Sequence, residues 1–202
     1  MFFLLGRQLL APVWSAIYSA ITYLVAALII IKVPAKIKKH WKSNREELGL
    51  SGLPTFTDIG LAIIGFIASI LISALVINLL SGFSWFNASE AQDVGFNNLQ
   101  TGIDRAIAFI ALAVIAPIAE EIIFRGWLYG KLRGRYHAVI AMALVAVLFG
   151  ALHGQLNVAV NVGILSVIMC LEREITGTVY AGIITHIIKN GVAFFMLFVL
   201  HF

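Results

Sequence analysis

Two adjacent carboxylates interrupt a long apolar stretch, in the segment Ala119-Glu120-Glu121-Ile122-Ile123-Phe124-Arg125. An ionised side chain near the middle of a bilayer costs about 2.5–3.5 kcal/mol on insertion scales, so such groups need partners, water or a function. Glu121 and Arg125 are four residues apart, so on a helix they share one face and can form an ion pair. Glu120 lies about 100° away around the helix, which leaves its carboxylate free to face a cavity.

Two later segments contain suitable partners for these carboxylates. Phe149 lies one helical turn before His153, and its ring would cover one side of the imidazole. His186 and Asn190 are also four residues apart and form a second polar face. A glutamate and a histidine that share one water make it nucleophilic, and N–H donors stabilise the oxyanion that forms on an attacked carbonyl. The sequence therefore predicts a hydrolytic site of Glu120, His153, His186 and Asn190, supported by Glu121, Arg125 and Phe149.

The composition indicates a membrane protein. Hydrophobic residues make up 61% of the 202 residues, charged residues make up 12%, and the mean hydropathy is +0.98. Soluble domains are about 45–50% apolar and about 25% charged, so a soluble core of this length could not bury so much apolar surface. The net charge of +4 comes from loop clusters, which favours membrane orientation over nucleic-acid binding. The expected partners are the lipid bilayer and a peptide or protein substrate at the membrane.

Apolar runs predict an all-α, polytopic transmembrane bundle of about six spanning helices plus one interfacial amphipathic helix. The basic segment 36–45 contains a tryptophan and suits the interfacial helix. Residues 1–100 would form the N-terminal helices, and 101–202 the catalytic core. We expect the first span to be retained, because it is too long for the core of a signal peptide. The predicted spans are 10–33, 57–80, 103–132, 137–153, 158–171 and 178–198.

The orientation follows from lysine and arginine in the short loops. Segments 34–46 and 125–135 are basic, whereas 81–102 has no lysine or arginine. The positive-inside rule then puts 34–56 and 131–136 in the cytoplasm and 81–102 outside. We expect the membrane to be a bacterial plasma membrane. If the third helix continues past the carboxylates, with a kink near Pro117, the four catalytic candidates reach similar depths. Their shared cavity would open toward the cytoplasm.

In order along the chain, Glu120-Glu121-x-x-x-Arg125, Phe149-x-x-x-His153 and His186-x-x-x-Asn190 resemble the three motifs of the CPBP family. This family holds the CAAX prenyl endopeptidases of the Rce1 type and the bacteriocin-processing and Abi-type immunity proteins. The resemblance covers about residues 101–191, and every motif position is intact. It implies an intramembrane glutamate protease in which Glu120 is the water-activating base, assisted by His153. It also implies that His186 and Asn190 stabilise the oxyanion, and that Glu121 and Arg125 are a supporting pair.

Other readings of the same residues remain open. Glu120, Glu121, His153 and His186 could instead bind a divalent metal such as zinc. The chain lacks a His-Glu-x-x-His signature, and Arg125 would repel a cation, so we favour a mechanism without a metal or other cofactor. The protein could also be a non-catalytic bacteriocin immunity or regulatory protein. Buried glutamate and histidine would also suit a proton-coupled transporter, although the two halves lack a matched pair of broken helices. The spacing Gly150-x-x-x-Gly154 predicts a close approach of helices.

Overall fold

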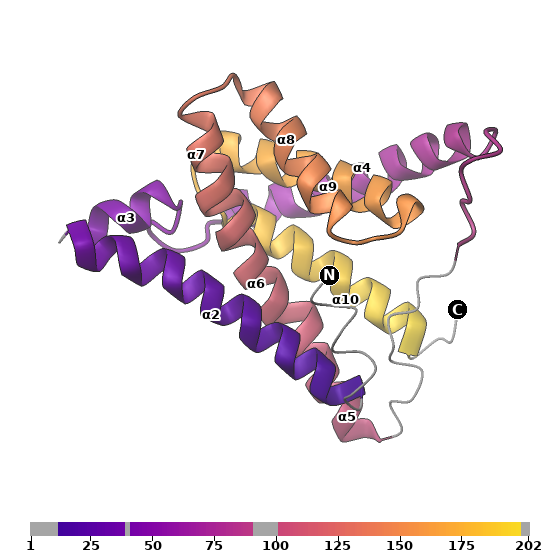
Figure 1. Ribbon diagram of the computed structural model, residues 1–202, viewed down its shortest axis with the longest axis horizontal. Helices are drawn as coiled ribbons and strands as arrows, with labels where there is room; N and C mark the ends of the chain where they lie inside the picture. The colour runs from indigo at the N-terminus through magenta and orange to yellow at the C-terminus, as the bar shows by residue number, and fades with distance from the viewer. Residues whose placement is uncertain (1–11, 39–40, 91–100, 199–202) are drawn as a thin grey trace.

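The computed structural model describes residues 12–38, 41–90 and 101–198, and these residues form helices joined by loops, without a β-strand (Figure 1). The predicted all-helical class is confirmed. The first helices are α2 (Pro12–Lys38), α3 (Trp41–Glu47) and α4 (Phe56–Leu80). A long segment follows, made of α5 (Gly102–Phe109), η1 (Ile110–Ile115), α6 (Ala116–Glu121), η2 (Ile122–Leu128) and α7 (Tyr129–Arg133). The last helices are α8 (Ala138–Ala151), α9 (Leu156–Thr176) and α10 (Tyr180–Phe198).

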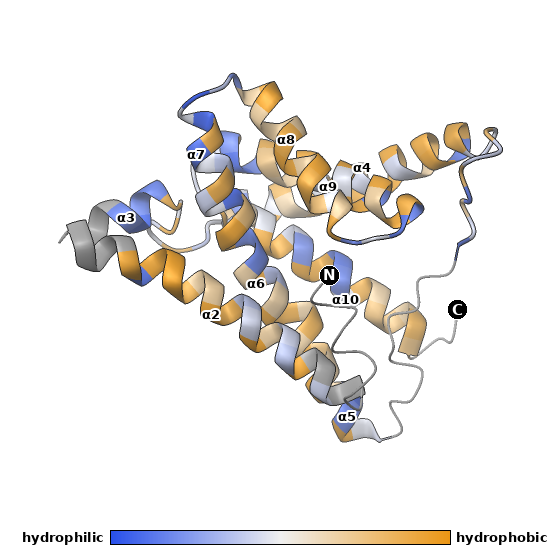
Figure 2. Cartoon of the chain, viewed as in Figure 1, coloured by the Kyte–Doolittle hydropathy of each residue, from blue (hydrophilic) through white to orange (hydrophobic). Residues whose placement is uncertain are grey.

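Three of the described segments are long and apolar enough to cross a membrane: Phe56–Leu80, Gly102–Arg133 and Tyr180–Phe198. Ile17–Val33 and Ala138–Ala151 are shorter apolar helices, and α9 carries the charged run Glu172-Arg173-Glu174 in its last turns. The hydropathy colouring shows apolar helices interrupted by hydrophilic residues part-way along α6 and α10 (Figure 2). The protein is therefore an integral membrane protein.

Helix α4 shows how the helices pack against one another. Its buried residues are small or polar and recur every three or four positions, as in Ala62, Gly65, Ser69 and Ser73. Large apolar side chains such as Ile64 and Leu71 are exposed. This pattern is the reverse of that in a soluble helix, and it allows close helix contact inside the bundle while apolar side chains face lipid. A capping box of Thr55 and Asp58 begins the helix.

The segment Gly102–Arg133 is one continuous helix with two π-helical parts. The sequence predicts a kink near Pro117, and the π-helical part Ile110–Ile115 ends two residues before this proline. In this part the Ala116 N–H donates to the carbonyl oxygen of Ala111, five residues earlier. Proline has no N–H, so the same pattern leaves the Leu112 carbonyl without a donor from Pro117. The helix therefore continues through the carboxylates, as their predicted depth requires.

The ends of the helices meet on two sides of the bundle. On one side, the Val179 N–H donates to the Gly49 carbonyl, and Arg133 forms an ion pair with Glu174. On the other, the Asn157 amide donates to the Glu90 carbonyl, which joins the loop after α4 to the start of α9. Alternating spans require this arrangement. That the first of these sides faces the cytoplasm stays a prediction.

Several predictions fall partly outside the described residues. The residues outside the description include 10 and 11 of the first predicted span and 39 and 40 of the basic segment. They also include 91–100 of the loop 81–102 that has no lysine or arginine. The same is true of the predicted domain boundary at residue 100. The predicted interfacial helix 36–45 is divided, because α2 continues to Lys38 and α3 begins at Trp41. The Asn44 amide donates to the Ile31 carbonyl, so α3 turns back against α2.

Candidate active site

A buried ion pair lies at the centre of the bundle. The Arg125 Nη1 donates to Glu121 Oε1 at 2.8 Å, and both residues have 0% of their surface exposed. The ion pair that the spacing of Glu121 and Arg125 predicts is therefore present. Gly182 of α10 lies directly beside it, since a Cβ atom there would be 3.1 Å from Glu121 Oε2. A glycine at this position lets the α10 backbone approach the carboxylate.

His186 of α10 joins this pair. Its Nδ1 lies 2.8 Å from Glu121 Oε1, so the carboxylate accepts from both the imidazole and the guanidinium. The hydrogen bond orients the ring and leaves Nε2 pointing toward Glu120, whose Oε2 lies 3.7 Å away. Only 3% of His186 is exposed. Thus Glu121 fixes the ring, and Nε2 is the only nitrogen of His186 that can take part in chemistry at Glu120.

Glu120 has neighbours from three other elements of the bundle. Besides His186, its carboxyl interacts electrostatically with Lys189 of α10 and with Arg125 of η2. The Tyr23 hydroxyl of α2 makes a hydrogen-bond contact with the same carboxyl. The Glu120 side chain is 13% exposed, whereas that of Glu121 is 0% exposed. The two adjacent carboxylates therefore differ in exposure: Glu121 is fully buried among its partners, whereas Glu120 is partly exposed.

Phe149 of α8 packs against both histidines of the site. Its ring centroid lies 5.0 Å from that of His153 and 5.9 Å from that of His186, both in edge contacts. The Arg125 guanidinium lies 4.5 Å from the centre of the same ring. Phe124 contacts it edge-on from η2. Phe149 therefore packs against residues of all three motifs, which makes it the structural centre of the site.

His153 lies in the turn after α8, whereas the sequence predicts it at the end of the fourth span. Its Nδ1 lies 2.8 Å from the Phe149 carbonyl, and this contact holds the ring against the Phe149 side chain. The 14 residues of α8 span about 21 Å, less than the roughly 30 Å of a bilayer core. If α8 begins at one membrane surface, the turn that carries His153 lies inside the membrane. Among the described residues, His153 and Glu120 make no direct polar contact.

Asn190 is held by the backbone of the opposite helix. Its Nδ2 donates to the Leu112 carbonyl at 3.0 Å, the group that Pro117 leaves without a helical donor. The hydrogen bond orients the amide, and the second N–H of Nδ2 stays available. Proline and asparagine are thus connected through one carbonyl, which the sequence alone does not reveal.

Two residues of the site were missed by sequence reasoning. Lys189 interacts electrostatically with both Glu120 and His153, and Tyr23 approaches Glu120 from the first described helix. A charged residue between His186 and Asn190 was a usable signal for Lys189, since an unneeded cation is costly in a membrane helix. Tyr23 had no such signal, because a single tyrosine is common in an apolar helix.

The alternative in which the site binds a divalent metal requires several ligand side chains to point toward one centre. In the part of the chain that the structure describes, no group of three or more histidine, cysteine, aspartate or glutamate side chains converges as a metal site would require. Glu121 Oε1 and His186 Nδ1 face each other at 2.8 Å instead of pointing toward a shared centre.

Comparison with known proteins gives one family match, over the part of the chain that carries the site. Residues 102–192 match the family model of the type II CAAX prenyl endopeptidase Rce1-like proteins, and this range contains every site residue that the sequence predicts. Tyr23 lies outside it. No curated protein and no solved structure matches the chain. Over residues 102–192, which carry the three motifs and the buried polar site, the chain is similar to the Rce1-like family of type II CAAX prenyl endopeptidases.

Proposed function

We propose that the protein is an intramembrane endopeptidase that hydrolyses a peptide bond in a membrane-associated substrate, such as a prenylated or leader peptide. One observation carries this proposal: side chains of all three motifs pack around the Phe149 ring, and Glu120 faces His186 Nε2 at 3.7 Å on the accessible side of the cluster. Buried acid, base and donor groups that converge in one place are typical of a catalytic site.

In the proposed reaction, Glu120 is the general base. A water molecule held by Glu120 and His153 gives a proton to the Glu120 carboxylate, and its oxygen forms a bond to the carbonyl carbon of the substrate. The electron pair of the carbonyl bond moves to oxygen and gives an oxyanion. Glu120 suits this role better than Glu121, since Glu121 Oε1 already accepts two hydrogen bonds.

His186 and Asn190 stabilise the oxyanion in this scheme. With a proton on each ring nitrogen, His186 donates to Glu121 through Nδ1 and to the oxyanion through Nε2. Asn190 donates through the N–H that Leu112 does not use. Donors that are oriented in advance need no rearrangement as charge develops, which is why they lower the barrier. The proton on Glu120 then moves to the amide nitrogen as the C–N bond breaks, and the carboxylate is restored.

The experiment that tests this function compares the membrane proteomes of cells that express the wild-type protein or the Glu120→Gln variant. We expect at least one peptide that is cleaved only in cells with the wild-type protein. That peptide, made with a quenched fluorophore, should be cleaved by the purified wild-type protein. Glu120→Gln, Glu120→Ala and His153→Ala should abolish this cleavage while the protein still folds in detergent.

The same variants separate the protease from the other readings. A non-catalytic immunity or regulatory protein would keep its effect in Glu120→Gln, because the amide has nearly the same shape as the carboxyl. Metal analysis of active, purified protein tests the metal-free mechanism: stoichiometric zinc whose removal abolishes cleavage would contradict it. Full cleavage activity in Glu120→Ala would reject the assignment of the base.

A further inference from the structure

The Glu120 side chain has a partner outside the matched family range, on helix α2. The α2 residues Ala20, Tyr23, Ala27 and Ile31 recur every three or four positions and form one stripe. Within it, Tyr23 and Ile31 pack with Ala27 against Ala119 and Ile122 of the helix that carries Glu120. Neighbouring side chains such as Leu24 and Leu28 are exposed. The stripe is therefore the face by which α2 meets the catalytic segment.

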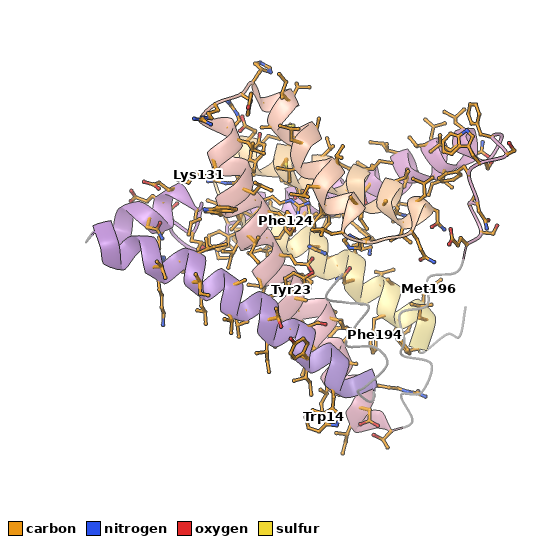
Figure 3. All side chains as sticks on the ribbon, viewed as in Figure 1. Trp14, Tyr23, Phe124, Lys131, Phe194 and Met196 are labelled. Carbon is orange, nitrogen blue, oxygen red and sulfur yellow. The ribbon has the colours of Figure 1, made fainter. Side chains whose placement is uncertain are left out.

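Small residues bring the two helices close together at this point. Ala27 and Ala119 are each 1% exposed and belong to the same cluster. Alanine at a helix contact lets the backbones approach closely, so a long side chain beside the contact can reach across to the neighbouring helix. Tyr23 does this: its hydroxyl makes a hydrogen-bond contact with the Glu120 carboxyl. Figure 3 labels Tyr23 where α2 passes α6.

We infer that Tyr23 is a positioning residue whose hydroxyl donates to the Glu120 carboxylate and holds it toward the water that it activates. This inference rests on the proposed role of Glu120 as the base. Tyr23 keeps its proton throughout the reaction and forms no bond to the substrate. Its function is to fix the orientation of the carboxylate and to stabilise the charged form of Glu120 by a hydrogen bond.

The other groups around Glu120 do not supply the same contact. Glu121 and Arg125 are paired with each other, and His186 is bonded to Glu121 through Nδ1. Lys189 acts on Glu120 electrostatically, without a hydrogen bond among the described residues. The Tyr23 hydroxyl is therefore the neutral donor at this carboxyl in the described part of the chain, and it comes from an element that the family match does not include.

The chain offers a matched pair of variants for the test. Tyr23→Phe removes only the hydroxyl and keeps the ring that packs at the interface. Tyr18→Phe makes the same change on the same helix, at a side chain that is 53% exposed.

On the quenched peptide substrate, Tyr23→Phe should lower kcat about tenfold with little change in KM, since a hydrogen bond to a charged group is lost. The acid limb of the pH–rate profile should move up by about one pH unit, because the charged base has lost a stabilising donor. Tyr18→Phe should behave like the wild type.

A second measurement does not depend on turnover. The infrared spectrum of the purified protein contains a carboxyl band of Glu120, identified by its loss in Glu120→Gln. This band should shift in Tyr23→Phe and stay in place in Tyr18→Phe, since the frequency of a carboxyl vibration depends on the hydrogen bonds that it accepts.

The outcomes distinguish this inference from the proposed function. An unshifted band in Tyr23→Phe, or a pH–rate profile equal to that of Tyr18→Phe, would overturn the role of Tyr23 even if Glu120→Gln is inactive. If Glu120→Gln retains full activity, the proposed function fails, and a shifted band would still establish the contact. A loss of activity in Tyr23→Phe that appears only in KM, with an unmoved acid limb, would also overturn positioning of the base.

Discussion

At the scale of single residues, two adjacent glutamates have different settings although their sequence context is nearly the same. Glu121 is completely buried and accepts from Arg125 and His186, whereas Glu120 faces accessible space beside His186 Nε2. One helical step separates the two side chains by about 100°, which is enough to bury one among its partners and leave the other partly exposed. The difference in their surroundings therefore comes from the direction of each side chain and not from residue type.

The buried ion pair leads to a prediction about stability. Arg125→Ala should destabilise the protein by about 3–5 kcal/mol, since it leaves the Glu121 charge buried with only His186 as a partner. We expect much lower abundance in membranes and a lower melting temperature in detergent. Arg133→Ala is the matched control, because it breaks the exposed pair with Glu174. It should have little effect. Equal melting temperatures for the two variants would contradict the structural importance of Arg125.

Asn190 leads to a prediction about catalysis. Asn190→Ala should slow cleavage by roughly 10²–10³-fold, as expected for the loss of one oxyanion donor. The same change also leaves the Leu112 carbonyl without its partner, so a structural effect must be separated from a catalytic one. The double variant Pro117→Ala/Asn190→Ala supplies a new backbone N–H at position 117 for that carbonyl. It should regain stability but not activity, as judged by melting temperature and kcat.

A recovery of cleavage in the double variant would contradict the role of Asn190 as a donor to the substrate. It would mean that the Asn190 side chain acts only by satisfying the Leu112 carbonyl.

At the scale of elements, the position of His153 depends on how closely α8 and α9 pack. Helices α8 and α9 form a hairpin, and a Cβ atom at Gly150 would lie 2.7 Å from the carbonyl oxygen of Ala159. The predicted close approach at Gly150 is confirmed. Gly154 has a different role: its φ is +82°, a backbone conformation that favours glycine, and nothing lies within 4 Å of an added Cβ. The glycine spacing thus combines one packing position with one turn position.

Gly150→Ala should therefore separate the α8–α9 hairpin and destabilise the protein by about 1–3 kcal/mol, since the clash is with backbone atoms that cannot rotate away. It should also reduce cleavage, because His153 follows directly after α8. Gly163→Ala on α9 is the control: its Cβ would meet Ala146 at 3.6 Å, an ordinary contact, and should be tolerated. Thermal unfolding in detergent measures both. A neutral Gly150→Ala would show that the hairpin has room that the described contacts do not indicate.

At the scale of the whole molecule, the bundle has two sides with different connections. One side joins the loop after α3 to the start of α10, and the other joins the loop after α4 to the start of α9. Lysine and arginine in the segments 34–46 and 125–135 predict that the first side faces the cytoplasm. The orientation decides from which side a substrate reaches Glu120.

Cysteine labelling tests this orientation. The chain has one cysteine, Cys170, with 0% exposure, so the parent protein should not react with a membrane-impermeant maleimide. Ser84→Cys in the loop after α4 should be labelled on intact cells. Ser51→Cys before α4 should be labelled only after the cells are made permeable. The reverse pattern would invert the predicted topology and place the opening of the site on the outer side.

The sequence by itself determined the membrane class, the approximate positions of the helices and the identity of the polar residues in the three motifs. These follow from composition and from spacing within single helices, such as the four residues between Glu121 and Arg125, and such spacing is preserved when a helix forms. It also predicted irregular helix geometry near Pro117, where the π-helical part Ile110–Ile115 lies, since a missing N–H is a local property.

Only the tertiary structure decided which atoms of those residues meet. Nothing along the chain connects Pro117 to Asn190 through the Leu112 carbonyl, directs His186 Nδ1 to Glu121, or brings Tyr23 to Glu120. These contacts depend on the rotation and depth of each helix against its neighbours. The rotation and depth are set by small residues such as Ala27, Ala119 and Gly150, which look alike at every position of an apolar helix until the helices pack.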